Sequence, residues 1–416
     1  MRKKIEDIKY YDGKTLCDGS IIIEDGKIVE VGTNSDDYDM LVSGDGCVVL
    51  PGFVNAHTHS AMTLMRSFAD DNPLDSWLKE SVFPIEAKMK AEDVYWLTRL
   101  AILEYLQNGI TSVFDMYFHN DAAVSAAIDS GFRFGMCGAV NDYGGNADVL
   151  ELDYRKFNRI DPLITYRLGL HAEYTTKRAT IEAIAHLAHS LRQPVFTHCA
   201  ETKEEVEGCM QRYGMTPVQL FSETGLWDDG GGIFHGVHLT TSDLKILKNR
   251  DVSVVTCPGS NLKLASGIAN VQAMLDNHIN VGIGTDGAAS NNALSMFREM
   301  YLVSGLAKQV TKDPTALPPE TVLRMATENG SKIAGTYAGK IQPGYVADLV
   351  FLNLDHPNTN PRNNDLKSIV YSADSRNVRL TMVAGEVRYM NGSFRVGEME
   401  EVIYNRCESI AERLLG

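Results

Sequence analysis

The sequence lacks any long apolar segment. Within its 416 residues, no run approaches the roughly 18 apolar residues that a membrane-spanning helix needs. The basic start, MRKKIEDIKYYDG, is not followed by the apolar region of a secretory signal. We therefore expect a cytoplasmic protein with no membrane partner.

Closely spaced cysteine pairs are also absent. The seven cysteines are scattered along the chain, and none forms a C-x-x-C motif. An odd number without paired spacing argues against a disulfide framework and for a reducing compartment. We expect these thiols to be buried and unpaired.

Positive charge is scarce. The chain has 39 lysine and arginine residues against 54 aspartate and glutamate residues, so its net charge is −15. Such a field repels phosphate backbones and anionic lipid, which excludes nucleic acid and membranes as main partners. A neutral or cationic small molecule fits better, while the oligomeric state, including a homo-oligomer, stays open.

Short β-rich runs alternate with helical periodicity between residues 51 and 290, a pattern typical of parallel strands joined by crossover helices. Eight such units close most economically as a (β/α)8 TIM barrel. The eight strand candidates are Phe53–His57, Thr111–Met116, Arg133–Gly138, Tyr166–His171, Pro194–His198, Ile233–Gly236, Ser253–Thr256 and Val281–Thr285.

Both chain ends show a different pattern, in which apolar and polar residues alternate around glycine turns in SIIIEDGKIVEVG and NVRLTMVAGEVRYMNG. We predict that residues 1–50 and 345–416 form a small β-sandwich domain and that residues 51–344 form the catalytic barrel. A final amphipathic helix is predicted in EVIYNRCESIAERLL, with its apolar face at Val402, Cys407, Ile410 and Leu414.

Histidines and an aspartate end several of the predicted strands. In PGFVNAHTHSAM, His57 and His59 are two apart at a strand end, so alternation sends both imidazoles to one face. His198 ends the strand in VFTHCAET, and Asp286 ends the strand in VGIGTDGAASNN. Each motif alone has an ordinary explanation: a polar pair at a strand end, a hydrogen-bonded core histidine, or a helix N-cap.

Together, these residues fall at the carboxyl ends of the strands, the face where barrel enzymes assemble their sites. Three histidines and one carboxylate suit zinc and leave a coordination position for water. We predict one divalent metal ion, with zinc the best match, held by His57, His59, His198 and Asp286. A purely structural zinc site is normally closed, so the open position argues against a metal-stabilised binding or assembly protein without turnover.

At these residues the sequence resembles the amidohydrolase superfamily, and within it the group of 5′-methylthioadenosine/S-adenosylhomocysteine deaminases and triazine chlorohydrolases. The resemblance covers nearly the whole chain, through DGSIIIEDGKIVEVG, PGFVNAHTH, THCAET, TDGAASNN and GKIQPGYVADLVFLNLD. It implies deamination of an adenosine-type nucleoside to the inosine-type product and ammonia. Members with two metal ions carry a lysine at the end of the fourth strand, but here that strand reads ITYRLGLHAEY, which implies a single ion.

The resemblance also implies which residues contact substrate. Trp77 and Glu86 match positions that line the nucleoside pocket, where Glu86 would accept hydrogen bonds from the ribose hydroxyls. His171 matches a pocket histidine after the fourth strand, and Ser290 matches a serine that helps to hold the base. Outside this context, Trp77 could be a core residue of a long loop and Glu86 an early-helix carboxylate favoured by the helix dipole.

Three residues are implied to act on the reacting atoms. Glu201, three residues after His198, would reach the purine ring and protonate N1. Asp286 would take the proton of the attacking water, and His235 would hydrogen-bond that water and stabilise the oxyanion. His238 is the alternative to His235, which is preferred because it lies nearer the strand end and matches the family's position.

One departure from the family pattern bears on the substrate. Members that act on S-adenosylhomocysteine are expected to carry arginines after the third strand, but here GMCGAVNDYGGNADVLELD has no arginine or lysine before Arg155. A substrate carboxylate would lose its bidentate partner and meet a strongly negative protein. We therefore predict 5′-methylthioadenosine, 5′-deoxyadenosine or adenosine in preference to S-adenosylhomocysteine. The alternative is a triazine chlorohydrolase or a free-base, guanine-type deaminase on the same metal site.

Overall fold

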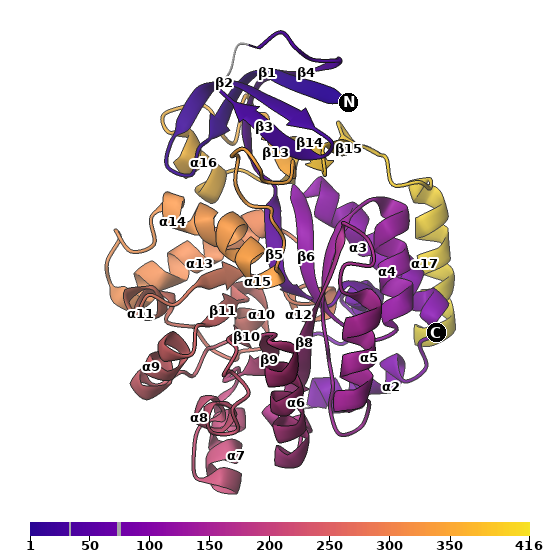
Figure 1. The fold of residues 1–416 in the computed structure, drawn as a ribbon, viewed down its shortest axis with the longest axis vertical. Coiled ribbons are helices and arrows are strands. Elements are labelled where there is room, and N and C mark those ends of the chain that lie inside the picture. The colour runs from indigo at the N-terminus through magenta and orange to yellow at the C-terminus, as the bar shows by residue number, and fades with distance from the viewer. Residues whose placement is uncertain (33–34, 73–75) are drawn as a thin grey trace.

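The computed structural model describes residues 1–32, 35–72 and 76–416. Within these ranges the strands form two eight-stranded sheets, a barrel surrounded by helices and a smaller sheet at one end of it (Figure 1). Among the helices of these ranges, none combines the length and the apolar character needed to cross a membrane.

The barrel strands are parallel and are hydrogen-bonded in sequence order. Their residues are mostly buried on both faces, which explains the continuous apolar and β-branched runs, such as VSVVT, that predicted them. The predicted barrel is confirmed, and its strand boundaries differ from the predicted ones by at most two residues. The strands are β5 Phe53–Thr58, β6 Ile110–Met116, β7 Arg133–Cys137, β8 Ile164–Ala172, β9 Val195–Cys199, β10 Gly231–His235, β11 Val252–Thr256 and β12 Val281–Ile283.

Hydrogen bonds just beyond β12 join the last strand of the barrel to the first. The backbone N–H of Asp286 donates to the carbonyl oxygen of His57 at 3.0 Å. The backbone N–H of Thr285 donates to the side-chain oxygen of Asn55 at 2.9 Å. The seam therefore brings together two residues that were predicted to bind metal.

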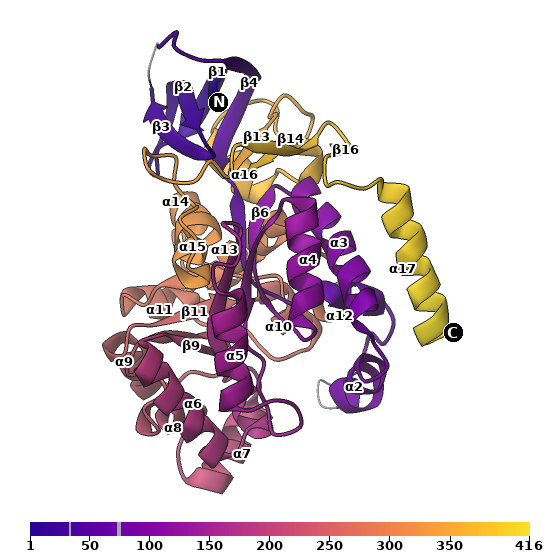
Figure 2. The ribbon, with the colours of Figure 1, turned by 45° about the vertical axis from the view of Figure 1, so that its right-hand side comes forward.

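Helices cover the outside of the barrel (Figures 1 and 2). Short segments of 3-10 or π geometry are η1 Ser60–Met65, η2 Trp77–Val82, η3 Glu173–Thr175, η4 Met325–Asn329 and η5 Ser375–Asn377. The helices are α2 Phe83–Glu86, α3 Ala91–Gln107, α4 Asn120–Ser130, α5 Ala147–Phe157, α6 Arg178–Leu191, α7 Lys203–Tyr213, α8 Pro217–Glu223, α9 Thr241–Asn249, α10 Pro258–Lys263, α11 Val271–Asp276, α12 Ala288–Asn291, α13 Met296–Thr311, α14 Pro319–Arg324, α15 Gly330–Ala334, α16 Asp365–Tyr371 and α17 Glu400–Leu415.

Strands from both chain ends build the smaller sheet, in the order β16-β15-β14-β13-β4-β1-β2-β3. The predicted small β-sandwich, built from both chain ends, is thus one mixed sheet, in which β13 pairs with β4 and joins the two ends of the chain. Because β4 ends at Pro51 and β5 begins at Phe53, this sheet lies at the amino ends of the barrel strands. Its strands are β1 Arg2–Tyr11, β2 Leu16–Glu24, β3 Lys27–Val31, β4 Met40–Pro51, β13 Leu349–Leu352, β14 Val378–Val383, β15 Glu386–Met390 and β16 Ser393–Phe394.

The predicted C-terminal helix is α17, which packs along α3 beside the barrel (Figures 1 and 2). One position of its predicted apolar face was wrong, because Val402 is only half-buried. A helical period instead places Ile403 in line with the later apolar residues. The buried face is Ile403, Cys407, Ile410 and Leu414.

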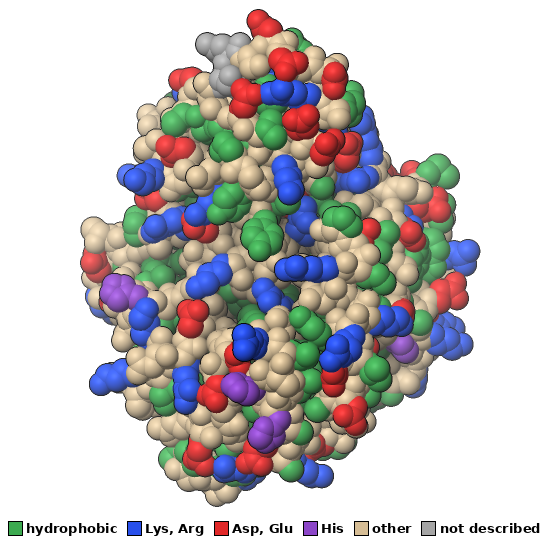
Figure 3. Space-filling view, viewed as in Figure 1, with side chains coloured by type: hydrophobic (Ala, Val, Ile, Leu, Met, Phe, Trp, Pro, Cys, Tyr) green, Lys and Arg blue, Asp and Glu red, His purple; other side chains and the backbone are tan. Residues whose placement is uncertain are grey.

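The surface mixes charges of both signs. On the face shown in Figure 3, lysine and arginine side chains lie among aspartate and glutamate side chains. Exposed ion pairs include Lys156 with Asp121 and Arg155 with Glu151. Pairs of this kind contribute only about 0–1 kcal/mol each to stability.

Candidate metal centre and substrate cavity

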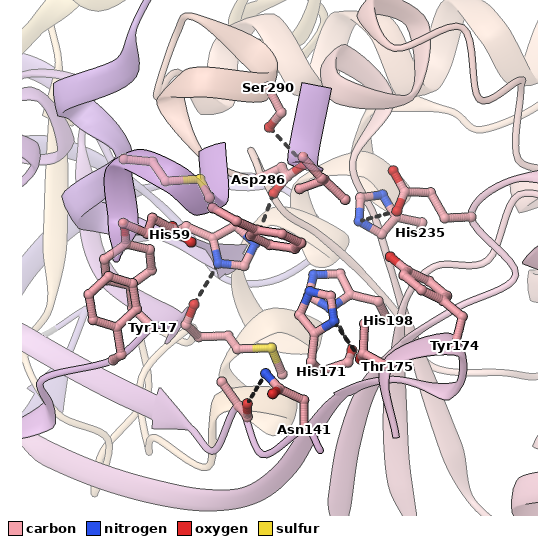
Figure 4. Close-up of a pocket in the computed structure, with 18 of the residues that line it drawn as sticks. His59, Tyr117, Asn141, His171, Tyr174, Thr175, His198, His235, Asp286 and Ser290 are labelled. Atoms are coloured by element: carbon pink, nitrogen blue, oxygen red, sulfur yellow. Dashed lines mark hydrogen bonds and ion pairs between the residues drawn. The ribbon is translucent and has the colours of Figure 1, made fainter. Parts of the chain in front are cut away.

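The residues predicted to bind metal converge at the carboxyl ends of the barrel strands (Figure 4). Nε2 of His57 lies 3.7 Å from Oδ1 of Asp286, and Nε2 of His59 lies 3.2 Å from the same oxygen. The ring centre of His198 is 4.8 Å from that of His57. Potential ligand atoms lie within 4.8 Å of one another in two groups that share His57: His57, His59 and Asp286, and His57, His198 and His235.

The strand ends explain this convergence. His57 lies in β5 and His59 follows two residues later, so the pleat sends both side chains to one side. His235 ends β10 with φ 72°, and Asp286 follows β12 with φ 61°. Left-handed backbone is unfavourable for residues with a Cβ and is concentrated at functional sites.

Backbone carbonyls fix two of the histidines. Nδ1 of His59 lies 2.5 Å from the carbonyl oxygen of Met116, and Nδ1 of His198 lies 2.8 Å from the carbonyl oxygen of His171. Because a carbonyl accepts, Nδ1 of each ring carries a proton, and Nε2 is the nitrogen that faces the metal-binding group. Such contacts orient metal-binding imidazoles and raise their basicity.

Hydroxyl groups orient the carboxylate of Asp286. Its Oδ2 accepts hydrogen bonds from Ser260 at 2.6 Å and from Ser290 at 2.8 Å. Its Oδ1 accepts the Gly287 N–H at 2.8 Å and faces the histidines. Burial opposes ionisation, but the bonded His59 and the other histidines hold the pKa of Asp286 well below its usual range.

Among the described histidines of this group, His57 is the one whose ring nitrogens make no hydrogen bond to the protein. Neither ring nitrogen has a hydrogen-bond partner among the described residues, although the side chain is fully buried against Phe234. An unpaired buried polar atom is unfavourable by about 1–3 kcal/mol. Burial, reinforced by His59 and His198, holds the pKa of His57 well below its usual value, so the ring is neutral and offers a lone pair. Imidazoles beside a carboxylate are a donor set that fits zinc.

Glu201 lies beside the same group. Its Oε2 is 3.8 Å from Nε2 of His235, whose Nδ1 contacts Oδ1 of Asn261 at 2.8 Å. Burial raises the pKa of Glu201, an effect that His235 opposes, and a raised pKa suits a carboxyl for proton transfer near neutral pH. His238, the alternative to His235, instead directs Nε2 to the carbonyl oxygen of Ser266 at 2.7 Å.

A cavity of about 2060 Å³ adjoins these residues, and the predicted substrate-binding residues line it. Trp77 is 5% exposed and begins η2, and Nδ1 of His171 contacts the Thr175 hydroxyl at 2.9 Å. Oε1 of Glu86 is buried without a hydrogen-bond partner in the described ranges, and burial raises the pKa of Glu86 to about 7. Glu86 therefore offers an acceptor to a ligand. Ser290 also lines the cavity, but its hydroxyl is bonded to Asp286.

Sequence reasoning missed several polar residues that support the site. Ser260 and Asn261 contact Asp286 and His235, and both come from PGSN, directly after β11. Their position beyond a barrel strand was the signal that could have identified them. Glu205, four residues after Glu201, accepts the N–H of Glu201 at 2.8 Å.

Two cations in the cavity wall, Arg212 and Lys263, come from elements that the sequence did not single out. Arg212 of α7 bonds both carboxylate oxygens of Glu173, at 3.2 and 2.6 Å. Lys263 of α10 bonds Asp70 at 2.6 Å. Both cations are therefore already paired with carboxylates of the protein.

Known proteins are similar to this chain over most of its length. A model of the amidohydrolase family matches residues 48–388. A 5-methylthioadenosine/S-adenosylhomocysteine deaminase of Pyrococcus furiosus is 38% identical over 404 residues, which cover 95% of this chain and 96% of the relative. A 5′-deoxyadenosine deaminase of Methanosarcina acetivorans is 39% identical over 414 residues, which cover 97% of this chain and 95% of the relative.

Solved structures of a deaminase and a chlorohydrolase also superpose on this chain over nearly its full length. An adenosine deaminase from Xanthomonas campestris with bound zinc superposes with a TM-score of 0.94 at 32% identity, covering 99% of this chain and 98% of that one. An atrazine chlorohydrolase from Arthrobacter aurescens, complexed with zinc, superposes with a TM-score of 0.90 at 23% identity, covering 98% of this chain and 100% of that one. At 23% identity, the likeness to the chlorohydrolase concerns the fold alone.

Proposed function

The chain belongs to the amidohydrolase family, and on that premise we propose that it is a zinc-dependent deaminase of adenosine-type nucleosides. The observation that carries the proposal is His57, which lies beside His59, His198 and Asp286 and whose buried ring nitrogens have no hydrogen-bond partner among the described residues. The proton-transfer candidate Glu201 lies beside this group. The relatives that are named as adenosine-type deaminases support the substrate class.

The residues divide the reaction among them. Zinc bound by His57, His59, His198 and Asp286 would lower the pKa of water from about 16 towards about 7, so that attack occurs at neutral pH. Asp286 takes a proton from the attacking water, whose oxygen adds to C6 of the purine. Glu201 gives a proton to N1, and His235 holds the attacking oxygen through Nε2. Glu201 then takes the remaining hydroxyl proton of the adduct and passes it to the amine, so that the C6–N bond breaks and ammonia leaves. The proton held by Asp286 finally restores Glu201.

Glu86 is the residue that we propose to bind the ribose. Its buried, unpartnered Oε1 would accept a hydrogen bond from a sugar hydroxyl. A free base or a triazine has no such hydroxyl, so this acceptor favours a nucleoside. Trp77, which lines the same cavity, supplies a flat apolar surface for the substrate.

The 5′ substituent is proposed to lack a carboxylate. The segment after β7 has no basic residue before Arg155, and the wall cations Arg212 and Lys263 are paired with Glu173 and Asp70. Lys79 and Lys203 also line the cavity, and Lys203 is paired with Glu207. At Arg212, Lys263 or Lys203, an amino-acid carboxylate would have to compete with a carboxylate of the protein. We therefore propose 5′-methylthioadenosine, 5′-deoxyadenosine or adenosine as substrate, ahead of S-adenosylhomocysteine.

Ammonia release from a panel of compounds tests the proposal. The panel contains adenosine, 5′-deoxyadenosine, 5′-methylthioadenosine, S-adenosylhomocysteine, guanine and a chlorotriazine. The first three are expected to turn over, with kcat/KM for S-adenosylhomocysteine lower by about 10-fold or more, the effect of one missing charged hydrogen bond. Comparable turnover of S-adenosylhomocysteine would show the carboxylate argument to be wrong. Preference for guanine, or chloride release from the triazine, would contradict the nucleoside assignment.

A further inference from the structure

Glu205 binds the backbone at Glu201 through both of its carboxylate oxygens. Oε1 accepts the N–H of Ala200 at 2.8 Å, and Oε2 accepts the N–H of Glu201 at 2.8 Å. The Glu205 side chain is only 6% exposed and lies in the first turn of α7. Thr202 caps that turn by accepting the N–H of Glu205 at 3.1 Å, so the carboxylate is itself held in place.

The peptide that Glu205 holds has an unusual backbone. Ala200 has φ 55°, in the left-handed region that disfavours a residue with a Cβ. On the opposite side, the carbonyl oxygen of Ala200 accepts the N–H of His238 at 2.9 Å. The turn between β9 and Glu201 is therefore fixed by hydrogen bonds on both of its faces.

We propose that Glu205 is a positioning residue, which aims the Glu201 side chain at N1 and the departing amine of the substrate. The proposal rests on the deaminase function proposed above, because that function defines the task of Glu201. Glu205 acts through Glu201, since both of its oxygens are occupied by backbone N–H groups. A carboxylate is required because it offers two acceptors, whereas glutamine would turn an NH2 donor towards one of the two N–H groups.

The test compares Glu205→Gln with the control Glu207→Gln, which makes the same change at an exposed position of α7. Each variant is assayed with adenosine, or the best nucleoside of the panel, and with 6-chloropurine ribonucleoside. Water adds to C6 of both compounds, but the amine must receive a proton to leave, whereas chloride leaves as an anion. A misaimed Glu201 therefore impairs the amine more than the chloride.

E205Q is expected to lower kcat for the amine by about 100-fold, the effect of a displacement of roughly 1 Å in a catalytic group. The chloride should lose about 10-fold less, with KM and zinc content close to wild type. E207Q should match the wild-type protein on both compounds.

An equal loss on both compounds, or full activity of E205Q, would overturn the positioning role. If E205Q does not fold, Glu205→Asp replaces it, because the shorter side chain keeps the charge but cannot reach both N–H groups, and the same amine-to-chloride ratio decides. Absence of ammonia release by the wild-type protein would instead overturn the proposed function.

Discussion

Two buried polar clusters lie at opposite ends of the barrel, and they differ in what they leave unpaired. At the amino end, Arg133 donates to both oxygens of Asp348, at 2.5 and 3.1 Å, and to the carbonyl oxygen of Pro162 at 3.1 Å. Asp348 also accepts the N–H of Ala384 at 2.7 Å. At the carboxyl end, His57 is also buried, but neither of its ring nitrogens has a hydrogen-bond partner in the described parts of the chain.

We interpret the paired cluster at the amino end as serving stability and the incomplete cluster at the carboxyl end as serving function. The Arg133–Asp348 pair is completed by the protein itself and links β7 of the barrel to the start of β13 in the small sheet. Under the proposed function, the group around His57 is completed by a bound cation. Buried polar groups are normally hydrogen-bonded, so an incomplete group at a strand end indicates a ligand site.

The largest expected effect is at the carboxyl end. Glu201→Gln should lower turnover by about 1,000-fold with zinc retained, because it removes the proton transfer to N1. His198→Ala should remove zinc as well as activity, and His189→Ala, at an exposed position, serves as its control. Turnover and zinc per chain are measured together. Near-normal turnover of E201Q would show that Glu201 is not the proton donor.

The amino-end pair should affect stability instead. Asp348→Ala leaves the buried Arg133 unpaired and should lower the free energy of unfolding by about 3–5 kcal/mol. Asp121→Ala, which breaks an exposed pair with Lys156, should lower it by less than about 1 kcal/mol. Urea unfolding measures both. A selective loss of zinc from folded D348A, without loss of stability, would contradict the division between the two ends.

The smallest effect is expected at Ser290. Ser290→Ala removes one of two hydroxyl donors to Asp286 and leaves Ser260, so zinc affinity should fall by about 10-fold. Competition with a chelator measures the affinity. An unchanged zinc affinity with a raised KM would instead favour the sequence-based role of Ser290 in holding the base.

The sequence predicted the barrel well because parallel strands buried on both faces leave continuous apolar runs. The histidine and aspartate positions were recognisable because each of them ends such a run. The domain boundaries after residues 50 and 344 stay a prediction, although β4 ends at Pro51 and β13 begins at Leu349.

Contacts between distant segments could not be predicted from the sequence. The bond between Ser260 and Asp286, and the pairing of Arg212 with Glu173, depend on how loops from different strands meet. The error at Val402 has a local cause: Ile403 is also apolar, and packing against neighbouring helices decides which of the two is buried.

Removal of the metal is the most direct test of whether deamination depends on zinc. The purified protein is depleted of metal with a chelator, its folding is checked by circular dichroism, and ammonia release from the best nucleoside is measured before and after zinc is restored. We expect about one zinc per chain, a folded but inactive metal-free protein, and recovery of activity with zinc, since bound zinc would lower the pKa of water from about 16 towards about 7. Undiminished ammonia release by the metal-free protein would show that the reaction does not depend on zinc.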